Sequence, residues 1–121
     1  MSDVESMDRS LSLNEHAALM WVLRVMPDSG EAELLYAQSL VATVTGGSLT
    51  MRELGVPPSC APVACSDGPL PVRAVAYDED GALLGEVLVW VSNGYLSAIE
   101  YAWYTDLVPR ALPAPHQLRQ E

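Results

Sequence analysis

The spacing of apolar and polar positions near the start of the chain predicts a helix. Ser12 stands three residues before Glu15, which is the spacing of a capping box, and an apolar run follows until Pro27. Because proline cannot continue the helical hydrogen-bond ladder, we expect this helix over about residues 12–26. Apolar side chains occupy more than one side of it, which indicates a helix that is deeply buried or half covered by another chain.

A second helix is predicted over about residues 29–40. Asp28 and Glu31 repeat the cap spacing, and residues that favour helices follow them. The pattern then becomes β-branched over residues 41–45, is interrupted by Gly46-Gly47 and resumes afterwards. The glycine pair is compatible with a hairpin turn or with a bulge in one long strand, and both alternatives stay open.

Three later runs predict an antiparallel β-meander over residues 72–77, 82–91 and 95–104. Asp80-Gly81 joins the first two runs and Asn93-Gly94 joins the last two; both dipeptides tolerate the positive φ of tight hairpins. The predicted fold class is therefore α+β, with two N-terminal helices packed on an antiparallel meander of about four strands.

Both faces of the predicted sheet carry apolar side chains. In the middle strand Val87, Val89 and Val91 alternate with Leu88 and Trp90, so neither face can be fully hydrated. The helices can cover one face. The other face needs a cover from the Pro-rich loop, the C-terminal tail or a second subunit.

The chain is expected to form one domain. Residues 1–11 lack periodicity and are predicted to be a flexible leader, residues 12–108 form the α+β domain, and residues 109–121 form a Pro-containing extended tail. Residues 55–71 contain five Pro and two Gly, which predicts an extended surface connection.

The amino-acid composition, and above all the net charge, argues against some classes of binding partner. Sixteen acidic residues stand against six Arg and no Lys, which gives a net charge of −10 and argues against nucleic acid and anionic lipid as partners. We find neither an apolar run long enough to cross a membrane nor the positive start of a secretory signal, so a cytoplasmic location is expected. Arg without Lys, together with abundant Ala, Val, Pro and Gly, favours a GC-rich bacterial origin, such as an actinobacterium.

Metal and cofactor motifs are absent from the sequence, so neither is predicted. Cys60 and Cys65 could form a zinc site only if two distant histidines converged on one loop; free thiols are the favoured interpretation. The acidic turn at residues 78–81 lacks carboxylates at the first and last positions of a calcium loop, which favours a hydrated hairpin turn.

Glu100 is the ionisable residue with the most informative setting, because it lies between Ile99 and Tyr101 in a predicted strand. A carboxylate that is half buried among aromatic rings can act as a general acid, because burial disfavours its charged form. The favoured alternative is a structural ion pair with Arg52 or Arg73 on a neighbouring strand.

Aromatic residues cluster in the last predicted strand. Strict alternation places Tyr95, Tyr101 and Trp103 on one face and Tyr104 on the other, with Trp90 on the adjacent strand. Tyr and Trp are typical of binding hot spots, although they can equally pack beneath helices. The two apolar sheet faces favour an intermolecular role.

Residues 85–106, GEVLVWVSNGYLSAIEYAWYTD, resemble the C-terminal hairpin of a group of small actinobacterial proteins. The resemblance rests on the Gly-Tyr-Leu-Ser-x-x-Glu-Tyr core followed by a Pro-containing tail, and it also takes in residues 44–54. It implies a similar strand–turn–strand ending. It implies no activity, cofactor or catalytic residue.

These observations favour a non-enzymatic, acidic protein-interaction module that binds a basic partner or forms a homodimer through its sheet. Immunity proteins, which neutralise bacterial toxins, are small, acidic and cytoplasmic in the same way. The alternative is a small-ligand-binding protein or enzyme with a cavity between helices and sheet, lined by Glu100, Tyr101 and Arg73. A deep pocket lined by these three side chains would favour the alternative.

Overall fold

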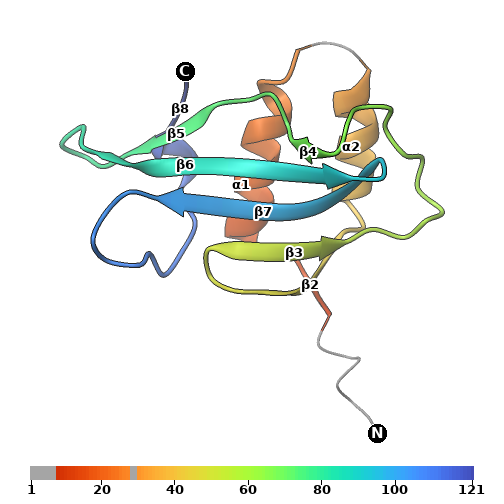
Figure 1. The fold of residues 1–121 in the computed structure, drawn as a ribbon, viewed down its shortest axis with the longest axis horizontal. Helices are drawn as coiled ribbons and strands as arrows, with labels where there is room; N and C mark the ends of the chain where they lie inside the picture. Colours follow the sequence, from red (N-terminus) through yellow and green to blue (C-terminus); the bar gives the residue numbers. More distant parts are fainter. Residues whose placement is uncertain (1–7, 28–29) are drawn as a thin grey trace, which may run out of the picture.

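The computed structural model describes residues 8–27 and 30–121 and has an α+β fold, with two N-terminal helices packed on one antiparallel sheet (Figure 1). The helices are α1 (Leu13–Arg24) and α2 (Glu31–Ser39), and a short 3-10 helix, η2 (Pro115–Gln117), lies near the C-terminus. The strands are β1 (Arg9–Ser10), β2 (Thr43–Gly47), β3 (Met51–Gly55), β4 (Gly68–Pro69), β5 (Ala74–Tyr77), β6 (Leu83–Ser92), β7 (Tyr95–Trp103) and β8 (Leu118–Gln120).

Within the described residues the sheet has eight strands, so the prediction of about four was too low. Seven strands follow the order β1-β2-β3-β7-β6-β5-β8, and β4 pairs with β6 outside this path. Three of the unexpected strands, β1, β4 and β8, contain only two or three residues. Segments this short show no alternation of their own and become strands only because a neighbouring strand offers free backbone groups.

Helix α1 begins where the capping box predicts. The Ser12 hydroxyl accepts a hydrogen bond from the Glu15 backbone N–H at 3.2 Å, and the Glu15 carboxylate accepts one from the Ser12 backbone N–H at 2.8 Å. Helix α2 has Gly30 at its N-cap, with a left-handed φ of 83°. The predicted cap residue Asp28 lies outside the described residues.

The predicted meander is confirmed, because β5, β6 and β7 are consecutive antiparallel neighbours. Its second turn is tight, with positive φ at both Asn93 and Gly94. One irregularity was not predicted. Trp90 pairs with Ala98 while Val91 pairs with Leu96, so Ser97 is an extra residue in β7 and forms a bulge.

The Gly46-Gly47 pair takes part in a hairpin and lies next to a bulge. Strands β2 and β3 are antiparallel partners, and the register shifts between Val44 and Gly46, which leaves Thr45 as an extra residue. Gly47 has a φ of +98°, and a Cβ there would clash with the backbone of Met51. A side chain at Gly47 therefore cannot be accommodated without moving the hairpin.

The C-terminal segment contains the 3-10 helix η2 and joins the sheet. Strand β8 pairs with β5, and the tail places Leu112 and Leu118 in the hydrophobic core. The Pro-rich connection likewise contributes Val63 and Leu70 to the core. Both segments are therefore anchored by buried aliphatic side chains as well as by backbone pairing.

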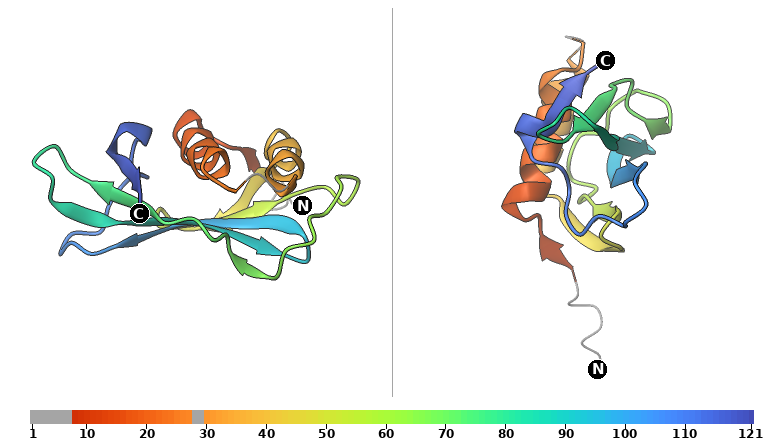
Figure 2. Two further views of the ribbon diagram at one scale, coloured as in Figure 1. Left: turned by 90° about the horizontal axis from the view of Figure 1, so that it is seen from above. Right: turned by 90° about the vertical axis from the view of Figure 1, so that its left-hand side faces the viewer.

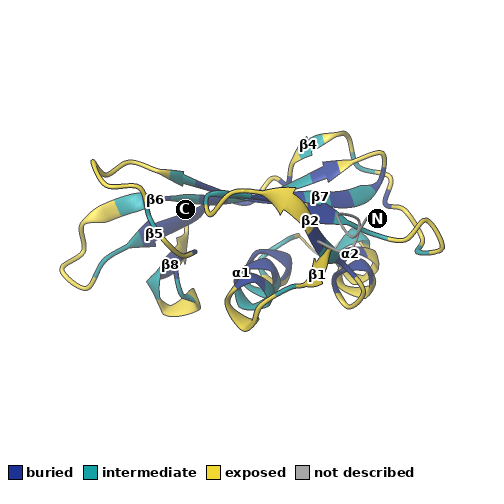
Figure 3. Ribbon diagram, turned by 90° about the horizontal axis from the view of Figure 1, so that it is seen from below, coloured by how far each residue is buried: buried dark blue, intermediate teal, exposed yellow. Residues whose placement is uncertain are grey.

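The elements form two layers. Both helices and the C-terminal segment lie on the same side of the sheet (Figure 2). The core fills the space between them and contains fully buried side chains of Leu19, Leu35, Val89 and Ile99. The opposite side of the sheet is reached by the connection that carries β4, at one end of the sheet (Figure 3).

Candidate protein-binding face

The side of the sheet that faces away from the helices carries a mixed set of apolar and acidic side chains, which we call the open face. Residues paired across antiparallel strands point to the same side, so the register defines its members. Ala98 is buried, Glu53 is exposed and the others are half-buried. Away from the β6–β7 turn, the open face comprises Met51 and Glu53 of β3, Glu86, Leu88 and Trp90 of β6, and Ala98, Glu100 and Ala102 of β7.

Glu100 lies on the open face and accepts a hydrogen bond from the indole Nε1 of Trp90 at 2.9 Å. The predicted ion pair of Glu100 with an arginine is wrong. Arg52 is on the helix side of the sheet and pairs with Glu15, and Arg73 pairs with Glu86. The sequence pattern could not reveal the indole N–H as the partner of Glu100, because Trp90 lies on β6 and is the diagonal, not the directly paired, neighbour of Glu100.

The bulge at Ser97 changes the predicted arrangement of the aromatic residues. Tyr95 pairs with Ser92 before the bulge, and Tyr101 pairs with Val87 after it, so the two tyrosines lie on opposite faces. The prediction that they share a face is wrong, because one extra residue reverses the alternation.

Each tyrosine has a distinct environment. The single O–H of Tyr95 is shared between the backbone carbonyls of Pro58 and Cys60, at 3.3 and 3.2 Å, and so holds the Pro-rich connection against the strand. Tyr101 is 5% exposed in the core, where burial raises the pKa of its hydroxyl above the ordinary value. Trp103 lies at the end of β7, and Tyr104, just beyond it, is exposed.

The charges of the open face are incompletely paired. Glu86 accepts from Arg73 at 3.2 Å, and the pKa of Arg73 is raised by this carboxylate. Glu53 and Glu100 form no ion pair with any side chain of the described part of the chain. Of the three carboxylates of the open face, Glu86 therefore has a cationic partner, whereas Glu53 and Glu100 have none among the described residues.

A buried ion cluster on the helix side was missed at the sequence level. Glu15 is 2% exposed and accepts from Arg9 through both carboxylate oxygens and from Arg52 Nε, each at 2.8 Å. Arg9 is the main cause of a carboxyl pKa lowered to about 2, with help from the Ser12 backbone and Arg52. Sequence spacing identified Glu15 only as a capping residue. Its double role depends on Arg9 of β1 and Arg52 of β3, which both reach its carboxylate.

Gln38 is a second residue that the sequence did not single out. It is fully buried, and its amide Nε2 donates to the carbonyls of Ala61 and Gly94 at 3.0 and 2.9 Å. Its Oε1 accepts from the Leu96 backbone at 2.9 Å. This one side chain therefore joins α2 to the Pro-rich connection and to the β6–β7 turn.

An apolar groove lies on the outer surface of the helical layer. Helix α1 presents His16, Met20 and Trp21 to it, α2 presents Tyr36, and the hollow has a volume of about 520 Å³. Leu13 at its end is 92% exposed. The sequence predicted a helix that is deeply buried or half covered by another chain; here α1 is buried on its sheet side and open on this one.

The structure brings no metal ligands together: within residues 8–27 and 30–121, no group of three His, Cys, Asp or Glu side chains could hold an ion. Cys60 and Cys65 are both free and half-buried. Burial is the main cause of a raised pKa for the Cys65 thiol, which disfavours the reactive thiolate. Within the same residues, neither helix has the length and hydropathy needed to cross a bilayer.

Comparisons with known proteins add no further assignment. No family model, no curated protein and no solved structure matches the chain. The resemblance of residues 85–106 to a group of actinobacterial proteins stays a prediction.

Proposed function

We propose that this protein is a non-enzymatic, acidic interaction module that binds a basic protein through the open face of its sheet. The observation that carries the proposal is the position of Leu88, Trp90 and Met51. These large apolar side chains remain half-exposed because the helices and the C-terminal segment all pack on the other side. Apolar and aromatic side chains surrounded by polar ones are typical of interface centres.

Charge favours a basic partner over a second copy of the chain. Glu53 and Glu100 lie beside the apolar centre without a cation from the described residues, and they would attract Lys or Arg side chains. Two copies of a chain with a net charge of −10 repel each other during encounter. A homodimer through the sheet is therefore the weaker form of the same proposal.

Immunity proteins offer one concrete version of this function, because they are small acidic proteins that meet basic toxins. The support comes from general features only: the acidic charge of the chain, its small size and a sheet face that the helices do not cover. The proposal also includes an actinobacterial origin and a cytoplasmic location.

The alternative, a ligand-binding protein or enzyme built around Glu100, Tyr101 and Arg73, receives less support. Glu100 pairs with Leu88 and Tyr101 with Val87, and these neighbours point to opposite faces of the sheet. Arg73 is exposed and engaged with Glu86. The three side chains therefore do not line one cavity.

The proposal is tested by affinity capture from an extract of the source organism with three forms of the chain: wild type, Trp90→Ala and the control Tyr36→Ala. Tyr36 is an exposed aromatic residue on the helical layer, so its removal leaves the open face unchanged. We expect a basic protein that binds wild type and Tyr36→Ala, is lost with Trp90→Ala and dissociates as salt is raised.

Two results would count against the proposal. One is a partner that binds Trp90→Ala as well as it binds wild type. The other is a salt-insensitive dimer in size-exclusion chromatography that Trp90→Ala leaves intact. Circular dichroism of each variant shows whether the fold is retained.

A further inference from the structure

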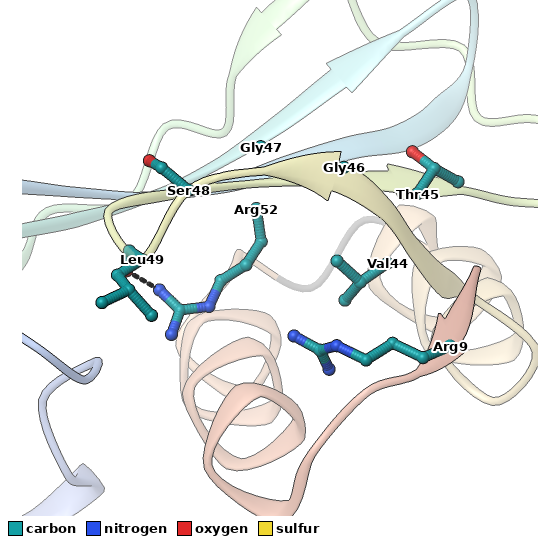
Figure 4. A pocket seen from close by; sticks show the side chains of 8 residues that line it. All are labelled: Arg9, Val44, Thr45, Gly46, Gly47, Ser48, Leu49 and Arg52. Atoms are coloured by element: carbon teal, nitrogen blue, oxygen red, sulfur yellow. Dashed lines mark hydrogen bonds between the residues drawn. The ribbon is translucent and has the colours of Figure 1, made fainter. Parts of the chain in front are cut away.

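A hollow of about 340 Å³ lies beneath the β2–β3 hairpin, on the helix side of the sheet (Figure 4). It is lined by Arg9, Arg52 and the hairpin residues 44–49. The two guanidinium groups enter this space from β1 and from β3, while α1 supplies Glu15 between them. Two of the six arginines of an acidic chain thus meet at one small hollow.

Arg52 has more hydrogen-bond donors here than the protein satisfies. A guanidinium carries five N–H donors. Arg52 uses one on Glu15 and one on the Leu49 carbonyl, so three have no acceptor within the described chain. Its side chain is only 10% exposed, and buried polar groups of this kind are nearly always hydrogen-bonded.

Arg9 also has N–H donors without an acceptor among the described residues. Its Nη1 reaches Glu15 at 2.8 Å and the Ser10 carbonyl at 3.1 Å, and its Nη2 reaches Glu15 at 2.8 Å. The Nε–H and the second Nη2 hydrogen have no acceptor within the described residues. Its side chain is 52% exposed, so the open side of the hollow remains in contact with solvent.

Glu15 cannot satisfy the remaining donors. One carboxylate oxygen accepts from Arg9 and from the Ser12 backbone, and the other accepts from Arg9 and Arg52. Each oxygen therefore already takes two hydrogen bonds, which is its full capacity. With one carboxylate and two guanidiniums, the cluster keeps one positive charge.

We propose that this hollow binds a small oxyanion, a phosphate or a carboxylate group, between Arg9 and Arg52. Paired N–H donors of guanidinium groups match the oxygen spacing of both anions. The remaining acidic residue of the hairpin, Glu53, pairs with Gly46 on the open face, whereas Arg52 points to the helix side. The hairpin backbone therefore separates its carboxylate from the site.

The net charge of the chain does not prevent such binding. Charges on the surface are screened over about 8 Å at physiological ionic strength, whereas a guanidinium in direct contact with the anion is screened much less. The local charge and the free N–H donors therefore decide the affinity for the anion, and the overall charge of −10 lowers that affinity only by screened repulsion.

The first test is a titration of the wild-type protein with inorganic phosphate at constant ionic strength, followed by the ¹⁵N resonances of the arginine Nε–H groups. We expect saturable shifts for Arg9 and Arg52. The other arginines, which lie outside the hollow, should not shift: Arg24, Arg73, Arg110 and Arg119. A parallel titration with acetate identifies the anion: tighter phosphate binding indicates a phosphate-bearing ligand, and tighter acetate binding indicates a carboxylate.

A matched pair of variants completes the test. Arg9→Gln should weaken phosphate or acetate binding about tenfold to a hundredfold, the effect of losing charge-assisted hydrogen bonds. Arg110→Gln removes the same charge from an exposed tail position and should leave the affinity unchanged. If Arg9→Gln does not fold, the titration of the wild-type arginine resonances still tests the proposal.

The proposal is overturned if neither anion shifts Arg9 and Arg52 more than chloride does, or if Arg9→Gln binds as wild type does. In those cases water satisfies the free donors. This site is on the opposite side of the sheet from the open face, so its failure leaves the proposed protein-binding function standing, and the reverse is also true.

Discussion

Both faces of strands β6 and β7 carry apolar side chains, but the two faces have very different surroundings. On the helix side Val87, Val89 and Ile99 are at most 1% exposed. On the open side Leu88 and Trp90 are half-buried and share the surface with carboxylates. The same period-two alternation therefore produced a core on one side and an accessible apolar surface on the other. Both helices and the C-terminal segment pack on the first side, and the connection that carries β4 reaches the second side only at one end of the sheet.

Shortening one side chain on each face tests whether the two faces differ in solution as they do in the structure. Ile99→Ala removes fully buried atoms and should lower the free energy of unfolding by about 4 kcal/mol. Leu88→Ala, on the open face, should cost only about 1 kcal/mol, because its side chain is already partly hydrated. Urea denaturation measures both, and equal losses would show that the open face is covered in solution.

The ion cluster of Glu15, Arg9 and Arg52 should contribute strongly to stability on the covered side. Glu15→Gln leaves two arginines without their carboxylate and should destabilise the fold by about 3 kcal/mol. Glu33→Gln, an exposed residue in the first turn of α2, serves as control and should change stability by less than about 0.5 kcal/mol.

The effect of Glu15 depends on pH in a direction that can be worked out. The folded pKa is about 2, below the ordinary value of 4.5, so the carboxylate favours the folded state above pH 4.5. This contribution declines as pH falls from 4.5 through 2 as the group becomes protonated. The stability difference between wild type and Glu15→Gln should shrink over that window; a constant difference would contradict the ion-pair account.

Gln38 connects the helical layer to the Pro-rich segment, and its removal should weaken this connection. Gln38→Ala leaves the Leu96 N–H and the carbonyls of Ala61 and Gly94 without their partner, which should cost about 2 kcal/mol. Gln120→Ala, at the exposed sheet edge, should cost much less. Hydrogen exchange should also show faster opening at the Leu96 amide in Gln38→Ala, and unchanged protection there would argue against the network.

The smallest stability change is expected on the open face. In Glu100→Gln the amide oxygen can still accept from Trp90, so the free energy of unfolding should change by less than about 0.5 kcal/mol. Affinity for the basic partner should nevertheless fall, because the charge is lost. Unfolding curves and binding titrations of the same variant separate the two effects. A large loss of stability would assign Glu100 a structural role.

Much of the fold could be predicted because it depends on neighbours in the chain. The Ser12–Glu15 capping box and the Asn93-Gly94 turn are local, and both are confirmed. The bulge at Ser97 was missed, because no residue type signals it, and it reversed the side on which Tyr95 lies relative to Tyr101. The short strands β1 and β8 were missed for a related reason: partners far along the chain create them.

The sequence by itself determined the helices, the meander, the charge and the presence of apolar residues on both faces of the sheet. These follow from spacing, turn chemistry and composition. Only the tertiary structure decided which face is covered, that Glu15 meets Arg9 and Arg52, and that Glu100 meets Trp90. The reason is that the packing of segments far apart in the sequence decides which side chains meet. One inserted residue in a strand is enough to move the side chains beyond it to the other face of the sheet.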